Sequence, residues 1–476
     1  METTEEFWER VSRYREMGMD PLRWVAGCAV KVDLTTVVYP ALRRLRPLLR
    51  ELGVIVAERE DADIFTAGRE EPTISRRIYN LRDPKIDRED LKRINPKRAI
   101  SLVQVHQRGA ETDKIFGDIL LSLYNSIALA EQTFIVGKGH SIITGYEDAE
   151  FALFDFISGS EAAKGEGFTL ANNDTIQVID PTADPGSKEQ TDVAVSNSLN
   201  DLIALGCYEG LRLLPVIDAP NEELEKRIFG NMEKYARKYG IRLLDADSPG
   251  RRKLLIGATF IGKTSKEPPV RPDLLTEGMK ILITRPFGDL APINVYLSCL
   301  ADEDFLKKLE ENDTLKAVEI AKNRVIETMR EPNLGIGKIV NQFLPDQDEE
   351  FITSEHLVAT GDMSGPGVLI FKEIAEKTKV DISLDELPVK YADYVRFATE
   401  NFLMDNATSG TNGAVALIGE EGLISEIMRK LKREGHDPRI IGTVTGKGDG
   451  RLETGDVVNE MIASAQLLSE VEIRKG

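Results

Sequence analysis

The chain has 476 residues, of which 41% are hydrophobic, so it is long enough to bury two or three separate cores. Its 80 acidic and 61 basic residues give a formal net charge of -19, which disfavours binding to nucleic acid and to anionic membranes. The N-terminal stretch has neither the basic start nor the apolar run of a signal peptide, and no later stretch reaches about 18 uninterrupted apolar residues, so we expect a cytoplasmic protein.

The first 141 residues are predicted to form an N-terminal segment that differs from the rest of the chain. It opens with an amphipathic helix and continues through a loop at residues 24–33. An apolar strand is expected at residues 54–57, and a helix with one apolar face at residues 116–130. Residues 58–97 are charged and punctuated by prolines, which indicates a surface excursion.

From residue 142 onwards, strands alternate with helices, which is the pattern of an α/β or α+β domain. A first domain is expected over residues 142–265, with strands at 151–156, 175–179, 211–217, 241–244 and 253–260 and helices at 193–205 and 222–238. A linker with three prolines separates it from a second domain, residues 276–476, near whose start lies the apolar strand MKILIT.

Residues 257–264, GATFIGKT, match the phosphate-loop pattern GxxxxGK[ST] letter for letter. A working phosphate loop follows a strand and leads into a helix whose N-terminal amides hold the phosphates. The next residues are SKEPPVRP, and their prolines cannot begin such a helix. We therefore predict one buried strand here and no phosphate loop.

Cysteine and histidine are too scattered for a disulfide framework or a zinc pattern. The three cysteines, Cys28, Cys207 and Cys299, lie far apart, and the four histidines do not complete a zinc motif with them. Any bound metal should therefore be held by oxygen ligands. Cys207 and Cys299 lie in apolar helical stretches and are expected in the core.

Four aspartates stand where a strand or turn meets a stretch rich in glycine or asparagine: Asp148, Asp180, Asp201 and Asp362. Mg²⁺ prefers oxygen ligands, and the charge of an ATP triphosphate has to be offset before a nucleophile attacks it. Carboxylates that converge from separate elements would serve this purpose. Each aspartate taken alone is better explained as a cap or turn residue, because Asp is common at such junctions.

The segments around these aspartates resemble, in the same order, the metal-binding motifs of the selenophosphate synthetase and aminoimidazole ribonucleotide synthetase superfamily. They read Glu147-Asp148-Ala149, Gln177-Val178-Ile179-Asp180, Asn197-Ser198-Leu199-Asn200-Asp201 and Thr360-Gly361-Asp362-Met363-Ser364-Gly365-Pro366-Gly367. GMKILITRPFGD and Asp405-Asn406-Ala407-Thr408-Ser409-Gly410 are also similar to family motifs. The resemblance implies a two-domain α+β PurM-like fold with an N-terminal insertion, bound ATP and Mg²⁺, and a homodimer formed through the first domains.

The resemblance also implies roles for single residues. The four aspartates would bind Mg²⁺. In AGCAVKV, Cys28 and Lys31 keep the spacing of the family's mobile catalytic loop, where a thiolate beside an ammonium handles the nucleophile and the lysine steadies a phosphate. The alternative is a buried cysteine in a strand with an outward lysine.

Nucleotide contacts would come from four segments of the chain. The glycine-rich run before Asp148 is expected to cover the phosphates, although an ordinary loop explains it as well. The run DADS at residues 245–248 replaces a glycine-rich turn of the family. The expected nucleotide-binding residues are Gly137, Lys138, Gly139, Asn197, Asp247, Ser248, Thr408, Ser409 and Gly410.

The sequence thus predicts ATP- and magnesium-dependent phosphoryl transfer, as in selenophosphate synthetase, to a selenide or sulfide acceptor near Cys28 and Lys31. One alternative is another enzyme of the superfamily, related to the hydrogenase maturation factor or to a small-molecule kinase. That maturation factor works through a C-terminal cysteine, which the ending LLSEVEIRKG does not contain. The other alternative is a nucleotide-binding scaffold without turnover.

Overall fold

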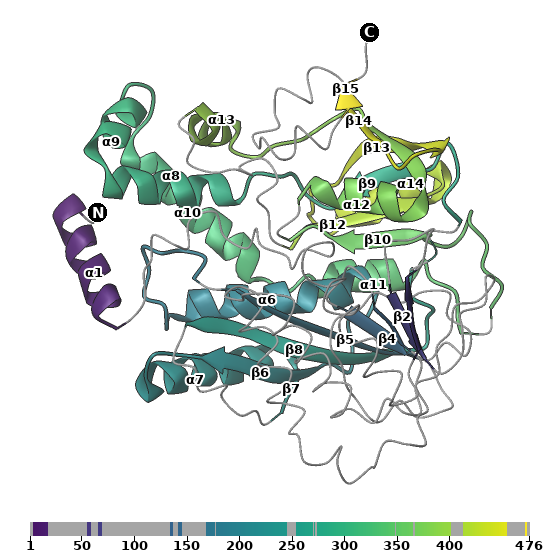
Figure 1. The fold of residues 1–476 in the computed structure, drawn as a ribbon, viewed down its shortest axis with the longest axis horizontal. Helices are drawn as coiled ribbons and strands as arrows, with labels where there is room; N and C mark the ends of the chain where they lie inside the picture. The colour runs from purple at the N-terminus through teal and green to yellow at the C-terminus, as the bar shows by residue number, and fades with distance from the viewer. Residues whose placement is uncertain are drawn as a thin grey trace.

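The computed structural model describes residues 3–17, 55–58, 65–68, 134–136, 141–144, 168–176, 178–244, 254–269, 271, 274–347, 349–364, 367–400, 413–454 and 472–473. These residues form an α+β fold with two mixed sheets and a small antiparallel sheet (Figure 1). Within these ranges, no helix combines the length and the apolar character needed to cross a membrane.

The first mixed sheet has the strand order β4-β5-β8-β6-β7 in the described part of the chain. Neighbouring strands are antiparallel except β6 and β7, which are parallel. Its strands are β4 (Ser141–Thr144), β5 (Phe168–Ile176), β6 (Arg212–Asp218), β7 (Arg242–Leu243) and β8 (Leu255–Thr264).

The central strand β8 contains all of GATFIGKT. β5 pairs with it from Thr264 back to Ile256, and β6 pairs with it on the other side from Leu255 to Ile261. An extended backbone hydrogen-bonded on both sides cannot curl around a phosphate. The prediction of a strand in place of a phosphate loop is therefore confirmed.

The second mixed sheet has the order β10-β12-β9-β13-β11-β14-β15 among the described residues. Its last two pairings are parallel and the others are antiparallel. Its strands are β9 (Lys280–Ile283), β10 (Ala359–Asp362), β11 (Val380–Leu384), β12 (Val415–Gly419), β13 (Arg439–Lys447), β14 (Leu452–Thr454) and β15 (Glu472–Ile473). The small sheet joins β1 (Ile55–Glu58), β2 (Phe65–Gly68) and β3 (Phe134–Val136).

Central strands of the second sheet are buried on both faces. In β9, Leu282 belongs to one hydrophobic cluster, whereas Ile281 and Ile283 belong to the other. In β12, Leu417 and Ile418 divide in the same way. Successive side chains of a strand point to opposite faces, so the unbroken apolar run that predicted the strand MKILIT follows from cover on both sides.

Local sequence signals explain where the helices begin and end. In α7, Asn221 caps the N-terminus by accepting a hydrogen bond from the Leu224 amide at 2.9 Å, and Gly240 ends the helix with a φ of 66°. The helices are α1 (Thr4–Glu16), α6 (Lys188–Ala204), α7 (Glu222–Tyr239), α8 (Leu290–Ala301), α9 (Glu303–Glu310), α10 (Leu315–Arg330), α11 (Leu334–Asn341), α12 (Leu369–Thr378), α13 (Ala392–Glu400) and α14 (Glu421–Arg433).

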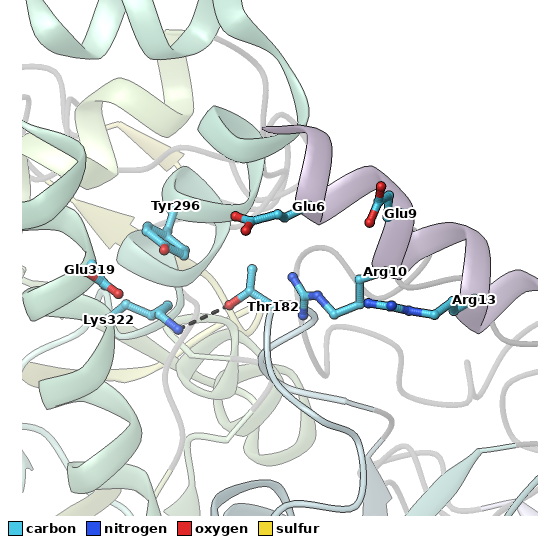
Figure 2. A pocket seen from close by; sticks show the side chains of 8 residues that line it. All are labelled: Glu6, Glu9, Arg10, Arg13, Thr182, Tyr296, Glu319 and Lys322. Carbon is cyan, nitrogen blue, oxygen red and sulfur yellow. Dashed lines mark hydrogen bonds between the residues drawn. The ribbon is translucent and has the colours of Figure 1, made fainter. Parts of the chain in front are cut away.

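The N-terminal helix α1 docks on parts of the chain far from it in sequence. Phe7 and Val11 are buried in the main hydrophobic cluster, and the Trp8 indole N–H donates to the carbonyl of Ala301 at 3.2 Å. The Tyr14 hydroxyl donates to the carbonyl of Ala183 at 3.3 Å. Beside α1 lies a cavity of about 530 Å³, whose lining includes Lys322 of α10 (Figure 2).

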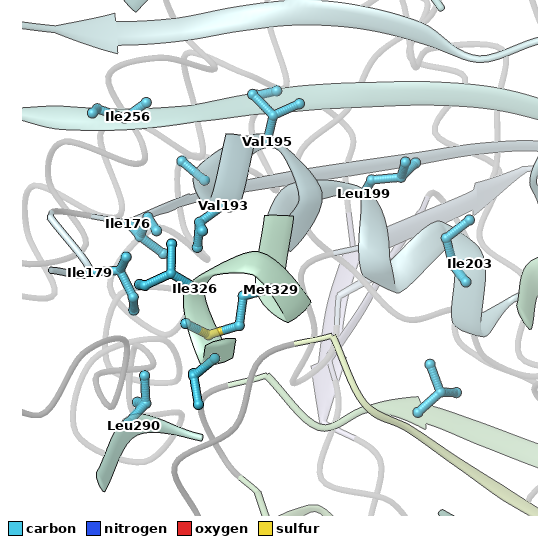
Figure 3. Close-up of a cluster of buried hydrophobic side chains, with 14 of the residues drawn as sticks. Ile176, Ile179, Val193, Val195, Leu199, Ile203, Ile256, Leu290, Ile326 and Met329 are labelled. Atoms are coloured by element: carbon cyan, nitrogen blue, oxygen red, sulfur yellow. The ribbon is translucent and has the colours of Figure 1, made fainter. Parts of the chain in front are cut away.

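Helix α6 lies between the first sheet and the elements from β9 onwards (Figure 1). We call the chain before β9 the first half and the chain from β9 onwards the second half. Its apolar side chains, including Val193, Leu199 and Ile203, share one cluster with Ile256 of β8 and Ile326 of α10 (Figure 3). Burial of apolar surface contributes about 25 cal/mol per Å², so this cluster stabilises the packing of α6 against both parts of the chain. The first sheet and one face of the second sheet therefore share a hydrophobic cluster.

Some predicted boundaries moved and others stay untested. The strand expected at residues 175–179 is β5, which begins at Phe168 and ends at Ile176. The expected strand at 54–57 and the opening helix match β1 and α1. The strand expected at 151–156 and the helix expected at 116–130 lie outside the described residues. The proposed domain limits stay a prediction.

Gly257 provides a test of the packing between β8 and β5. A Cβ atom at this position would lie 2.1 Å from the carbonyl oxygen of Asp174. We expect Gly257→Ala to lower the free energy of unfolding by about 2 kcal/mol, because backbone atoms have to move. Gly230→Ala in α7, where a Cβ meets nothing within 4 Å, should raise it by about 0.5–1 kcal/mol. Urea unfolding measures both, and equal effects would contradict this packing.

Candidate functional site

Almost all of α6 is buried, and this includes its polar residues. From Lys188 to Ala204, every residue except Lys188, Glu189 and Asp201 is buried. A buried amide or hydroxyl without a partner costs about 1–3 kcal/mol, so such groups are expected to be hydrogen-bonded. The partners of the polar residues therefore show which groups α6 positions.

The first such group is the carboxylate of Asp174 on β5. The Asn197 side-chain amide donates to Asp174 Oδ2 at 2.6 Å. The backbone amide of Thr175 donates to Oδ1 at 2.7 Å, and the Ser198 hydroxyl donates to the Asp174 carbonyl at 2.7 Å. Asp174 is thus fixed against α6 by both its side chain and its backbone.

The second group is the carboxylate of Asp362, at the end of β10. Asn200 donates from its side-chain amide to Asp362 Oδ1. The same oxygen accepts from the backbone amide of Ser364 at 3.0 Å and from its hydroxyl at 2.8 Å. Only 9% of Asp362 is exposed. Donors from two separate elements therefore hold this carboxylate in one orientation.

Asn200 belongs to a ring of hydrogen bonds, here called the Asn200 network. The ring consists of Asn200, Asn333, Asp362, Ser364 and Gly413. Asn333, just before α11, donates to Asn200 Oδ1 at 2.9 Å and to the carbonyl of Gly413 at 2.6 Å. The Gly413 amide donates to the Ser364 hydroxyl oxygen at 2.8 Å. The network joins α6, β10, α11 and the residues before β12.

Asp201 lies on the same turn of α6 as the two asparagines that bind these carboxylates. Asn197, Asn200 and Asp201 have the spacing i, i+3 and i+4, so they occupy one face of α6. Between Gln190 and Ala204, every residue of the helix is buried except Asp201, which is partly exposed. One turn of α6 therefore carries Asp201 and, through its two asparagines, holds Asp174 and Asp362.

This donor set suits Mg²⁺ by its chemistry. The polar side-chain atoms of these aspartates and asparagines are oxygens and amide nitrogens, and Mg²⁺ prefers hard oxygen ligands. In the described ranges, no three Asp, Glu, His or Cys side chains lie close enough together to hold a metal ion by themselves. Mg²⁺ usually binds through one or two carboxylates together with substrate phosphates and water, so the arrangement fits a metal that arrives with a nucleotide.

Asp180 occupies a different place, near the other end of α6. Its Oδ2 accepts from the Lys322 ammonium at 2.6 Å, and its carbonyl accepts from the Gln190 side chain at 2.9 Å. Gln190 and Asn200 are ten residues apart on the helix, which corresponds to about 15 Å. The structure thus brings Asp362 to the Asn197–Asp201 turn and holds Asp180 at Lys322. The metal role of Asp180 stays a prediction.

The other predicted site residues lie outside the part of the chain that the structure describes. Their assigned roles stay predictions from the resemblance. They are Cys28, Lys31, Gly137, Lys138, Gly139, Asp148, Asp247, Ser248, Thr408, Ser409 and Gly410.

Sequence reasoning missed Asp174, Asn200, Asn333 and Ser364 as members of the site. Asn200 and Ser364 could have been predicted, because each lies in a motif segment already identified around Asp201 or Asp362. Asp174 carried no signal, because the strand was expected to begin one residue later. Asn333 becomes relevant only when α11 packs against α6, which is a tertiary contact.

Comparisons with known proteins find likenesses of structure alone. The chain matches no protein family and no curated protein. A solved structure of the hydrogenase maturation protein HypE in complex with ATP is 19% identical, covering 64% of this chain and 85% of that chain with a TM-score of 0.42. Thiamine-monophosphate kinase from Stenotrophomonas maltophilia K279a is 17% identical, covering 60% and 84% with a TM-score of 0.42.

A third solved structure, the protein tt0281 from Thermus thermophilus, is 15% identical and covers 60% of this chain and 85% of that chain with a TM-score of 0.44. TM-scores below 0.5 at such identities do not assign a family. Function therefore has to be inferred from the residues of this chain.

The Asn200 network can be tested by a change that preserves shape. Asn200→Asp places a second carboxylate against Asp362 and removes the amide donor. We expect the free energy of unfolding, measured with urea in the presence of EDTA, to fall by about 2–3 kcal/mol. Asn323→Asp on the exposed side of α10 should change it by less than about 0.5 kcal/mol. Equal losses in the two variants would show that Asn200 does not join the elements.

Thiol reactivity should test the burial of Cys207 and Cys299. Burial raises the pKa of Cys207 and of Cys299 to about 12. At pH 8 such a thiol is ionised in roughly one molecule in ten thousand, and the thiolate is the reactive form. We expect iodoacetamide to leave both unlabelled in the native protein and to label both in urea, as read by peptide mass spectrometry. Rapid native labelling of either would contradict their burial.

Proposed function

We propose that this chain binds ATP with Mg²⁺ at the carboxylates around α6 and transfers a phosphoryl group from it. The observation that carries the proposal is the placement of Asp362. Hydrogen bonds from Asn200 and Ser364 hold its carboxylate at the turn of α6 that carries Asp201. Asp362 is thus bound by the residue next to Asp201 in the sequence, and this supports the shared metal-binding role that the resemblance to the selenophosphate synthetase superfamily implies.

The residues of the chain would act by positioning. Asn200 and Ser364 fix the direction of the Asp362 carboxylate, and Asn197 fixes that of Asp174. Asp201 and Asp362 would hold Mg²⁺, which, when bound, offsets the negative charge of the nucleotide phosphates. Prearranged charges of this kind need no rearrangement during the reaction, which is how phosphoryl-transfer enzymes lower the barrier.

The acceptor of the phosphoryl group is the finer part of the proposal. Cys28 and Lys31 keep the three-residue spacing of the catalytic loop that they resemble. A thiolate next to an ammonium suits a chalcogen nucleophile, so we assign selenide or sulfide as the acceptor. Phosphate would pass from ATP to that nucleophile as the bond to the leaving nucleotide oxygen breaks.

ATP turnover with and without selenide tests both parts. The full chain should consume ATP in the presence of Mg²⁺, faster with selenide. Asp362→Asn and Asp201→Asn should each lower the rate roughly a hundredfold, because charge stabilisation is lost. Lys263→Ala, within β8, should leave it unchanged.

Three other results would count against the proposal in different ways. Loss of turnover in Lys263→Ala would revive the phosphate-loop interpretation. Tight nucleotide binding by calorimetry without turnover under any acceptor would favour a scaffold. Turnover without any effect of selenide would remove the acceptor and leave the ATP chemistry.

A further inference from the structure

Lys322 of α10 is a lysine whose ammonium is buried between the two halves of the chain. Its side chain is 9% exposed and that of Asp180 is 6% exposed, with 2.6 Å between Lys322 Nζ and Asp180 Oδ2. The ammonium also donates to the Thr182 hydroxyl at 3.2 Å, the dashed line in Figure 2, and lies 4.9 Å from the centre of the Tyr296 ring. A buried lysine is retained at such a position only with partners of this kind.

Both oxygens of the Asp180 carboxylate have donors. Oδ2 accepts from Lys322, while Oδ1 accepts from the Thr182 amide at 2.9 Å and the Thr182 hydroxyl at 2.5 Å. The backbone is held as well, since the Gln190 side chain donates to the Asp180 carbonyl and accepts from the Ile179 amide. Asp180 therefore has no freedom to turn towards the Asn197–Asp201 end of α6.

We propose that Lys322 supplies the cation at Asp180, so that this aspartate joins the two halves of the chain and is not a ligand of Mg²⁺. A magnesium ion bound to the same carboxylate would lie about 2.1 Å from its oxygen, in direct repulsion with an ammonium 2.6 Å from that oxygen. An ammonium on the protein gives the same charge neutralisation permanently and without a metal.

A second ion pair of α10 supports a joining role. Arg330, eight residues after Lys322 on the same helix, binds the Asp192 carboxylate of α6 through Nε at 3.2 Å and Nη2 at 3.0 Å. Residues eight apart lie on nearly the same face of a helix. One face of α10 thus carries two cations that meet two carboxylates of the first half, Asp180 and Asp192.

Thermal unfolding in the absence of any ligand tests the pair. Lys322→Met leaves Asp180 buried without a cation, and Asp180→Asn leaves Lys322 without an anion. Each single variant should lower the Tm by several degrees, and the double variant Lys322→Met/Asp180→Asn should recover more than half of the larger loss. If the two single losses simply add in the double variant, the pair does not join the halves and the proposal fails.

Metal binding tests the claim that Asp180 is not a ligand of Mg²⁺. This claim rests on the proposed function. Mn²⁺ serves as the probe, titrated with a non-hydrolysable ATP analogue and followed by electron paramagnetic resonance. Asp180→Asn should bind Mn²⁺ within threefold of the unmodified chain, whereas Asp362→Asn should bind at least tenfold more weakly.

The outcomes separate the two claims. A tenfold loss in Asp180→Asn, with the Tm cycle still showing a folded protein, would overturn the assignment of Lys322 and leave the proposed function standing. An unchanged affinity in Asp362→Asn would instead count against the proposed metal site, and the Tm cycle would still decide the role of the Lys322–Asp180 pair.

Discussion

The rest of the structure depends on the burial of α6. A helix that is covered on nearly all sides has to give each of its polar groups a protein partner, because water cannot reach them. α6 meets most of this requirement with residues from the strand beside it, from β10 and from the start of α11, and Asp192 Oδ1 is the exception among the described residues of the helix. The hydrogen bonds that satisfy the buried side-chain amides of α6 are thus the same bonds that fix the carboxylates of Asp174 and Asp362.

Two acidic residues that looked alike in the sequence have different hydrogen-bond partners in the structure. Asp180 and Asp362 both follow a short apolar or small-residue stretch. In the structure, Asp362 accepts from neutral donors of Asn200 and Ser364, whereas Asp180 accepts from the charged Lys322. Neutral donors orient a carboxylate, whereas an ammonium also offsets its charge. The partner, more than the position at a strand end, decides what such a residue can do.

Much of the fold could be predicted from the sequence, because it is encoded by local patterns. The Asn221 cap and Gly240 define α7, and the prolines after Thr264 correctly excluded a phosphate loop. The position of Asp201 on a helix also followed from periodicity. The pairing of Asp180 with Lys322 could not be predicted, because 142 positions separate the two residues and nothing near either one indicates the other. The same holds for Asn333 and Asn200, which meet only when α11 packs on α6.

A core shared between two sheets means that the polypeptide cannot be divided at its proline-rich linker. A fragment that ended before β9 would keep α6 but would leave Leu199 and Ile203 facing solvent. The complementary fragment would carry Lys322 without Asp180 and Arg330 without Asp192. Each piece would display an apolar surface of the kind that drives aggregation, so neither should fold alone. We therefore expect substitutions on one side of α6 to constrain those tolerated on the other.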